Sequence, residues 1–430
     1  MVNAKSVAAN SARLIVLSID GMHPDLYRRA HEHGLKTPNL QELARCGASA
    51  TAVESVFPST TYPAHATLVT GVPPRAHGIY SHLASLDPTE PARPWHWFAA
   101  AIRVPALWSL ARAHGLKTAA ISWPVSAGAP IDYNVPEIWD PAAPDPYLDF
   151  QTVAHHSTSR LFEELLRAVK PSSHTGPDHL RGEAAIHIWR KYRPDVMLVH
   201  FVGYDQQAHR YGPRAREALA ALELADHEIG RLRATVSHDD RVAVVVLSDH
   251  GFLPVEKEAA PLAILAQEGL FDMKGKKHPE LKRLGAVHAG GSFAVFWLEE
   301  PSSPEQQALE RALKQLKETG AVAEVVGRDK LERLGSDPDA EWILDAAPGY
   351  FFSDRFSGPM IRKADKDRGT HGQLPGRAGM EAAFIAAGPG IAAGKDLGRI
   401  KLTDVAPTLA NLLGVAIDEL ATDAEPLSLA

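Results

Sequence analysis

Short runs of apolar, often β-branched residues recur along the chain and alternate with segments of helical periodicity. Such runs predict buried strands, and they cover residues 13–20, 117–123, 195–201, 241–247 and 381–388. Amphipathic segments that end at a glycine or run for several turns predict helices at 37–47, 105–115, 214–236 and 402–414. This β-α-β rhythm predicts an α/β fold, a sandwich in which a central, mostly parallel sheet has helices on both faces.

The rhythm changes between residues 255 and 365. This stretch contains a separate strand pattern at 292–297, an amphipathic helix pattern at 304–320, and turns rich in Pro, Gly and Asp. We therefore expect an inserted α+β cap at 255–365. A catalytic domain made of 1–254 and 366–430 would surround it.

A turn with two adjacent threonines stands out in the first half of the chain. Residues 48–57 predict a strand that leads into it, Thr60 and Thr61 lie between two prolines, and 64–71 has a helical pattern. A threonine hydroxyl is a poor nucleophile until a metal ion or a base takes its proton. The turn therefore predicts a catalytic hydroxyl if such a partner lies nearby.

Side chains suited to metal binding follow the predicted strands or the turns near them. They are Asp20, Asp205, His209, Asp249, His250 and His371. Ligands bind at the carboxyl ends of strands in α/β sheets, so we expect these side chains to meet there. Asp20 alone does not indicate a metal site, because an aspartate after a strand is often a helix cap. Carboxylates with neutral imidazoles are typical zinc ligands, and six suit two metal ions, with Thr61 as a shared or terminal ligand.

Charge and composition limit the function classes. The 430 residues are 45% hydrophobic and 23% charged, as in soluble globular proteins. The net charge of −7 argues against a nucleic-acid-binding surface, although a nucleotide remains open as a small substrate. The oligomeric state is left open.

Compartment and redox state follow from cysteine usage and apolar runs. Cys46 is the single cysteine, which we expect in the core, so no internal disulfide is possible. The first residues contain no long apolar segment, and no run of about 18 apolar residues follows, so we expect no membrane span. The sequence favours a cytoplasmic location, with a periplasmic or secreted one if the N-terminus was trimmed.

Seven short motifs occur in an order that resembles the type I phosphodiesterase/nucleotide pyrophosphatase family of the alkaline phosphatase superfamily. They are Asp20-Gly21, Pro58-x-x-Thr61-Tyr-Pro-x-His65, Thr70-Gly71, His77-Gly78, Asp205-x-x-x-His209, Ser248-Asp-His-Gly251 and Thr370-His-Gly372. Each motif alone is a weak indication of the family, but seven motifs in the family's order, each at a predicted strand end or turn, are a specific indication. The resemblance covers about 13–254 and 369–414 and implies an alkaline-phosphatase-like fold.

The resemblance also implies a role for each matching residue. One zinc ion would be held by Asp20, Asp249 and His250 together with Thr61, and a second by Asp205, His209 and His371. Manganese or iron remains open at one site. Thr61 matches the nucleophile, with Thr60 as second choice, and a phosphothreonine intermediate would be hydrolysed by hydroxide on the other zinc. The implied substrates are small phosphodiesters or nucleotide pyrophosphates.

The sequence departs from the family pattern at Ala64, His82 and Ala208, and the departure at His82 keeps other functions open. His82 stands where the family usually has an Asn that holds a phosphoryl oxygen, and Ala208 replaces a Gly. A phosphomonoesterase or a phosphonoacetate-type phosphonate hydrolase with the same metals is therefore one alternative. A non-catalytic, zinc-containing binding protein is another. Phosphotransfer between sugar or glycerate phosphates shares the superfamily core, but the Thr61 context argues against it.

Several further residues have both a structural and a functional interpretation. His65 and His77 fit structural roles, because each lies in a helix or loop with local partners. The aromatic residues Tyr80, Trp95, Trp97 and Phe98 form either a substrate-binding wall or ordinary surface packing.

Overall fold

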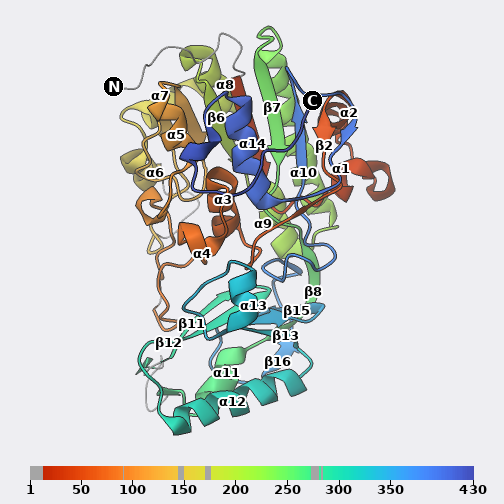
Figure 1. The fold of residues 1–430 in the computed structure, drawn as a ribbon. Helices are drawn as coiled ribbons and strands as arrows, with labels where there is room; N and C mark the ends of the chain where they lie inside the picture. Colours follow the sequence, from red (N-terminus) through yellow and green to blue (C-terminus); the bar gives the residue numbers. More distant parts are fainter. Residues whose placement is uncertain (1–12, 91, 144–149, 170–175, 273–279, 282–283) are drawn as a thin grey trace.

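An eight-stranded sheet forms the centre of the larger part of the molecule (Figure 1). The computed structural model describes residues 13–90, 92–143, 150–169, 176–272, 280–281 and 284–430. The strand order is β19-β2-β18-β7-β1-β6-β4-β5, and β7, β1, β6, β4 and β5 run parallel, whereas β18 is antiparallel to both neighbours. The bounds are β1 (Arg13–Ile19), β2 (Ala48–Ser49), β4 (Thr118–Ile121), β5 (Tyr133–Val135), β6 (Val196–Phe201), β7 (Val242–Leu247), β18 (Phe384–Ala387) and β19 (Lys395–Asp396). The predicted α/β fold with a mostly parallel sheet is confirmed.

Helices cover both faces of this sheet, and alternate residues of β1 show why. Ile15 and Leu17 point into a core shared with α2 (Pro38–Cys46), α8 (Pro177–Tyr192) and α10 (Arg216–Val236). Leu14 and Val16 point to the other face, where α3 (Thr61–Thr70), α5 (Leu107–Ala113) and α14 (Val405–Leu412) pack. Successive side chains of a strand point to opposite faces, so a continuous apolar strand can bury both.

Two expectations about the region before the threonine turn are wrong. Residues 48–57 form no single strand, because β2 ends at Ser49 and β3 (Ala52–Glu54) pairs with β20 (Arg399–Lys401) in a separate two-stranded sheet. Cys46 is exposed instead of lying in the core. It is the last residue of α2, and its Sγ contacts Glu42 Oε1 at 3.0 Å on the solvent side of that helix.

A second, antiparallel sheet lies below the first in Figure 1. It contains β11 (Leu284–Ala289), β12 (Ser292–Trp297), β14 (Trp342–Ala346) and β13 (Val322–Gly327), in that order. One face packs on α11 (Pro261–Gln267) and α12 (Ser303–Glu318). The other packs against Phe57 and Leu83, so this sheet supports the segment that leads to the threonine turn. Strand β12 and helix α12 match the strand and helix predicted at 292–297 and 304–320.

Strand β8 (Leu253–Ala259) leads from the first sheet to the second. It pairs with β15 (Gly349–Phe352), β16 (Ile361–Lys363) and β17 (Gly369–Thr370). The pairing of β17 with β8 brings the chain back toward the carboxyl edge of the first sheet directly before His371. Segments separated by more than 100 residues are thereby joined at the edge of the site.

Within the residues described, no helix combines the length and the apolar character that crossing a membrane requires. The expectation drawn from residues 1–12 lies outside the described residues.

Candidate active site

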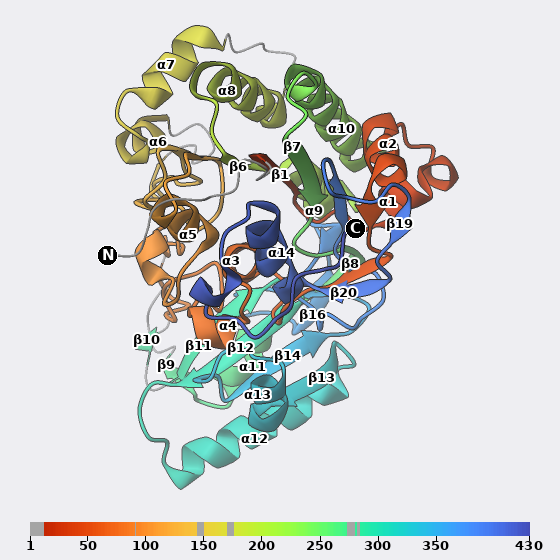
Figure 2. The ribbon, with the colours of Figure 1, turned by 45° about the horizontal axis from the view of Figure 1, so that its top comes forward.

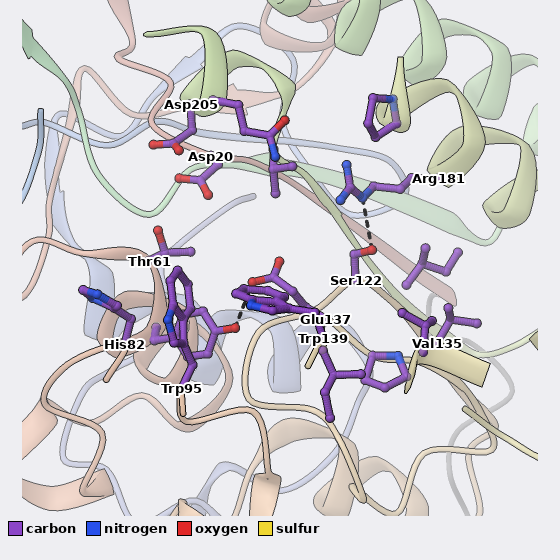
Figure 3. Close-up of a pocket in the computed structure, with 18 of the residues that line it drawn as sticks. Asp20, Thr61, His82, Trp95, Ser122, Val135, Glu137, Trp139, Arg181 and Asp205 are labelled. Atoms are coloured by element: carbon purple, nitrogen blue, oxygen red, sulfur yellow. Dashed lines mark hydrogen bonds between the residues drawn. The ribbon is translucent and has the colours of Figure 1, made fainter. Parts of the chain in front are cut away.

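The carboxyl edge of the large sheet brings the predicted ligands together. Asp20 follows β1, and Asp249 and His250 follow β7. Helix α9 (Gly203–Tyr211) begins just after β6 and carries Asp205 and His209 on consecutive turns. Figure 3 shows Asp20 and Asp205 side by side above Thr61, at one end of a cavity. The sheet therefore positions side chains from distant parts of the sequence at one edge.

One cluster consists of Asp205, His209 and His371. The Nε2 atoms of His209 and His371 are 3.1 Å apart. Asp205 Oδ1 lies 3.6 Å from each of these nitrogens. Three potential ligand atoms thus converge within 4.8 Å of one another, the arrangement of a candidate metal site.

A second cluster contains Asp20, Asp205 and His250, whose ligand atoms also lie within 4.8 Å of one another. His250 Nε2 is 3.5 Å from Asp20 Oδ1 and 3.1 Å from Asp249 Oδ2. Asp205 therefore borders both clusters, a detail that the spacing along the chain does not reveal. All six predicted ligands meet at this edge of the sheet.

Hydrogen bonds to backbone carbonyls orient all three imidazoles. The Nδ1 atom of each histidine faces a carbonyl oxygen: His209 that of Gly369 at 3.1 Å, His250 that of Gly251 at 3.0 Å, and His371 that of Ser59 at 3.2 Å. A carbonyl only accepts, so Nδ1 carries the proton and donates it. When the rings are neutral, their Nε2 lone pairs point into the clusters, which is the tautomer that a metal ligand needs.

The carboxylates leave unused oxygens in the same place. Asp20 Oδ1, Asp205 Oδ1 and Asp249 Oδ2 are buried without a hydrogen-bond partner in the described part of the chain. Buried carboxylate oxygens are costly unless they are paired or coordinate a cation. Three such oxygens beside three imidazole lone pairs fit divalent metal ions that accept nitrogen and oxygen ligands.

The pKa values in the clusters reflect this crowding. Burial raises the pKa of Asp20 well above its usual value, and the charges of Asp205 and Asp249 raise it further. Burial also raises the pKa of Asp205. Burial disfavours charge on His250, but Asp249, Asp20 and Asp205 together outweigh this and raise the His250 pKa to about 9. Burial and the neighbouring histidines lower the pKa of His371. Added positive charge would therefore stabilise the ionised form of these buried carboxylates.

Thr61 borders the second cluster from the first turn of α3. Its Oγ1 lies 3.4 Å from His250 Nε2, and its side chain is half-buried at the cavity. Thr60 precedes the helix, and its buried Oγ1 has no hydrogen-bond partner among the described residues. The N-terminus of a helix presents free N–H groups and a positive dipole end, which favour a phosphoryl group there.

A buried hydrogen-bonded chain behind Asp20 was not predicted from the sequence. His200 Nε2 faces Asp20 Oδ2 at 3.1 Å, and its Nδ1 faces Glu137 Oε2 at 3.1 Å. The Tyr62 hydroxyl donates to Glu137 Oε1 at 3.0 Å. Burial disfavours a charged His200, yet the bonds to Asp20 and Glu137 raise its pKa to about 10. The signal available in the sequence was a polar residue inside the apolar strand β6.

His65 and His77 both lie inside the fold. His65 Nε2 contacts Ser18 Oγ at 2.9 Å, and His77 Nε2 contacts Thr67 Oγ1 at 3.0 Å. Burial lowers the pKa of both to about 3, so the rings are neutral. Neither belongs to the two ligand clusters among the described residues.

A cavity of about 870 Å³ opens beside the clusters. His82 and Trp95 line it below Thr61, and Trp139 and Glu137 line it beside Trp95 (Figure 3). The ring centroids of His82 and Trp95 are 4.6 Å apart, and those of Trp95 and Trp139 are 4.7 Å apart. The cavity therefore has an aromatic wall next to the candidate nucleophile.

Of the four aromatic residues named from the sequence, only Trp95 lines the cavity. Trp95 lines the cavity, whereas Trp97 is buried in a small core and Phe98 is exposed. Tyr80 contacts Arg103 and does not line the cavity. Trp139 completes the wall and was missed, because only folding brings it beside Trp95.

Comparisons with solved structures show the fold to which the chain belongs. Murine ectonucleotide pyrophosphatase/phosphodiesterase 5, an inactive variant in complex with AMP, superposes with a TM-score of 0.67 at 18% identity over 96% of this chain and 97% of that one. The human counterpart gives a TM-score of 0.66 at 18% identity over the same shares. The chain thus has an alkaline-phosphatase-like α/β fold, as expected.

The family model described as type I phosphodiesterase/nucleotide pyrophosphatase matches residues 14–373. The chain belongs to this family. Human ectonucleotide pyrophosphatase/phosphodiesterase family member 7 is 24% identical over 261 residues, 58% of this chain and 50% of that protein. Venom phosphodiesterase 2 of Crotalus adamanteus is 25% identical over 252 residues, 55% of this chain and 26% of that protein. The chain spans about half the length of the curated relatives it matches, or less.

Proposed function

We propose that the chain is a metal-dependent hydrolase of phosphodiester or nucleotide pyrophosphate bonds and that Thr61 is its nucleophile. The observation that carries this proposal is the position of Thr61 Oγ1, 3.4 Å from His250 Nε2 at the edge of the ligand clusters. Family membership supports the same reaction class. The catalytic domain is 1–254 with 366–430, and 255–365 is an inserted cap.

The proposed ligand sets rest on the family resemblance, and the convergence of the side chains supports them. Asp20, Asp249, His250 and Thr61 would hold one ion, and Asp205, His209 and His371 would hold the other. Zinc suits these nitrogen and oxygen donors, with manganese or iron as alternatives at one site. When bound, two such ions stabilise the charge of the transferring phosphoryl group and lower the pKa of the attacking hydroxyl.

The chain's own residues account for the covalent steps. Thr61 Oγ attacks phosphorus while the bond to the leaving oxygen breaks, and that oxygen leaves with the bonding electrons and gains a proton. Water then attacks the phosphothreonine, which releases the Thr61 hydroxyl and the phosphate product. Burial and nearby charges lower the pKa of His82 to about 3, so its neutral ring donates one N–H to a phosphoryl oxygen.

The size of the cavity favours a diester over a monoester. A phosphate monoester presents one organic group, and a phosphonate of the phosphonoacetate type is smaller still. A cavity of about 870 Å³ leaves space for a second substituent. The aromatic wall of Trp95 and Trp139 suits an apolar or aromatic one.

The test compares hydrolysis of bis-p-nitrophenyl phosphate with that of p-nitrophenyl phosphate in added zinc. Thr61→Ala should reduce diesterase kcat by about 10³-fold or more, because it removes the nucleophile, while bound zinc is retained in part. Thr60→Ala is the matched control and should keep activity. Loss of activity in Thr60→Ala alone would move the nucleophile to Thr60.

Other outcomes select the alternatives. A preference for the monoester would identify a phosphatase-like enzyme and make His82 the residue to vary first. Zinc bound without turnover of either ester would favour a phosphonate substrate or a binding protein. Phosphonoacetate hydrolysis, measured with zinc content before and after dialysis against a chelator, separates these two, because only a phosphonate hydrolase has an activity that is lost with the metal.

A further inference from the structure

The second sheet contacts the candidate ligand His371 through one tight turn, residues 289–292, which joins β11 to β12. Figure 2 shows this sheet, with α12 packed on it, below α3 and α14 of the larger part. The backbone N–H of Gly291 donates a hydrogen bond to the carbonyl oxygen of His371 at 2.7 Å. The imidazole Nδ1 of His371 faces the carbonyl of Ser59 at 3.2 Å. The backbone of His371 is thus held by the 289–292 turn, and its ring by the segment before Thr61.

Glycines allow the two backbones to approach each other this closely. A Cβ on Gly290 would lie 2.3 Å from Thr370 Oγ1, and a Cβ on Gly372 would lie 2.2 Å from the carbonyl oxygen of Ala289. Both glycines also have a positive φ, +59° at Gly290 and +106° at Gly372, which disfavours any side chain. A side chain at Gly290 would therefore push against the residue directly before His371.

A buried ion pair joins the same sheet to the segment after His371. Asp345 lies on β14, and its side chain is fully buried. Its Oδ1 accepts a hydrogen bond from the backbone N–H of Leu374 at 3.0 Å, and its Oδ2 pairs with Arg377. A buried carboxylate is costly without partners, so this pairing favours one position of the segment. The second sheet therefore holds the segment at His371 and again beyond it.

These contacts matter because His371 lies outside the regular elements. It follows β17, which ends at Thr370, and it precedes β18, which begins at Phe384. Its partners Asp205 and His209 lie on helix α9, whose backbone hydrogen bonds fix their spacing. An irregular segment has no such ladder and depends on tertiary contacts for its position. For His371, the second sheet supplies them.

We infer that the second sheet positions His371 as a metal ligand and that Gly290 and Asp345 are the positioning residues. The inference rests on the role proposed for His371 in the metal-dependent hydrolase. Neither Gly290 nor Asp345 belongs to the ligand clusters of the described chain, so each acts through the segment that carries His371. Residues that orient a ligand from outside typically contribute about 10-fold to 100-fold to metal affinity.

The first experiment compares Gly290→Ala with Gly320→Ala. Both glycines lie in the region of the second sheet and have similar backbone angles, with φ of +59° and +72°, so alanine carries a similar backbone cost at each. A Cβ on Gly320 would meet no described atom within 4 Å. Competition with a fluorescent chelator should show zinc affinity reduced by about 10-fold or more in Gly290→Ala and unchanged in Gly320→Ala. Equal affinities in the two variants would overturn the role of the turn.

The second experiment acts from outside the cavity, because Asp345 is not among the residues that line it. Asp345→Asn removes the charge that pairs with Arg377 and should reduce the affinity for zinc by about 10-fold. Glu258→Gln is the matched control. Glu258 is also a buried carboxylate, but it pairs with Arg355 and Arg362 instead of the segment that carries His371. The same zinc affinity in both variants would show that Asp345 contributes to folding alone.

The wild type provides a test that does not depend on the folding of a variant. Coupling between two sites is reciprocal, so zinc should slow amide hydrogen exchange in the 289–292 turn more than in α12. Exchange followed by mass spectrometry with and without zinc measures this difference. An equal change in the two segments would contradict the inference.

Zinc binding and hydrolysis are measured separately, so this inference and the proposed function can fail separately. If zinc binds but its affinity is the same in each variant and its control, the inference fails and the hydrolase function stands. If the affinity depends on Gly290 and Asp345 but no diester is hydrolysed, the hydrolase function fails and the inference stands. If the wild type binds no divalent metal ion, both fail.

Discussion

At the scale of single residues, His200 links the candidate metal cluster to the cavity wall. Both of its nitrogens face carboxylate oxygens, Asp20 Oδ2 on one side and Glu137 Oε2 on the other. Its side chain is fully buried, so water cannot replace it as a donor. His200 thereby holds Asp20 with Oδ1 free toward His250, and we expect it to act as a positioning residue.

Replacing His200 by Gln should lower zinc affinity by about 10-fold to 100-fold, because the amide cannot donate to both carboxylates. Competition with a fluorescent zinc chelator measures the affinity. His77→Gln is the control, since His77 is equally buried but bonds to Thr67, away from the clusters. The same zinc affinity in both variants would show that His200 is only a packing residue.

At the scale of elements, helix α9 depends on a cap that comes from another helix. Asp178 on α8 accepts hydrogen bonds from the backbone N–H groups of Val202 at 3.1 Å and Gly203 at 2.8 Å. A Cβ at position 203 would lie 2.6 Å from Asp178 Oδ2, so glycine permits this close approach. Asp178 also pairs with Arg181, and its negative charge suits a helix N-terminus.

Because α9 carries Asp205 and His209, losing this cap should affect the metal site. Asp178→Ala should destabilise the protein by about 1–3 kcal/mol and reduce zinc affinity and kcat/KM together. Asp178→Asn, which keeps one acceptor oxygen, should lie between it and the wild type. Urea unfolding and zinc competition measure both effects.

A cap in the second sheet region provides the control for this prediction. Ser302 and Glu305 form a capping box at the start of α12. Ser302→Ala should cost about 1 kcal/mol and leave kcat/KM unchanged. If Asp178→Ala also lowers stability but leaves kcat/KM unchanged, the cap of α9 contributes to stability and not to the metal site.

At the scale of the whole molecule, the fold concentrates negative charge where the strands end. Three carboxylates meet there with unsatisfied oxygens. In the metal-free protein, burial and mutual repulsion raise the pKa of Asp20 and Asp205. A raised carboxyl pKa means that the folded form holds protons more tightly than the unfolded form, so this stability is lost as the pH rises through the folded pKa.

Zinc should therefore stabilise the protein more at pH 8 than at pH 6. His250, with its pKa raised to about 9, contributes stability to the metal-free form at low pH that declines as the pH approaches 9. Protons also compete with zinc for the same ligands at low pH. The measurement is the melting temperature with zinc and after chelation at both pH values. Asp205→Asn should lose most of the gain, and an equal gain at pH 6 and pH 8 would contradict the charge argument.

The sequence predicted elements wherever a local pattern is sufficient. The strands around Leu17 and Val245 are uninterrupted apolar runs, and burial on both faces of a sheet requires such runs. The residues of 48–57 suit a single strand, but the chain leaves the first sheet after Ser49. Pairing with β20 decides that change, and β20 lies almost 350 residues further along the chain.

The sequence by itself determined the α/β class and predicted which candidate ligands follow the strands and where the threonine turn lies, because strand ends and turns are local features. The tertiary structure decided that Asp205 borders both clusters and that His200 contacts the side chain of Asp20. It also decided that α6 (Phe150–His156) and α7 (Leu161–Ala168) line the cavity. These relations depend on distances between segments that are remote in sequence. Such distances are set by how strands are ordered in a sheet and how helices pack on it, which no local pattern specifies.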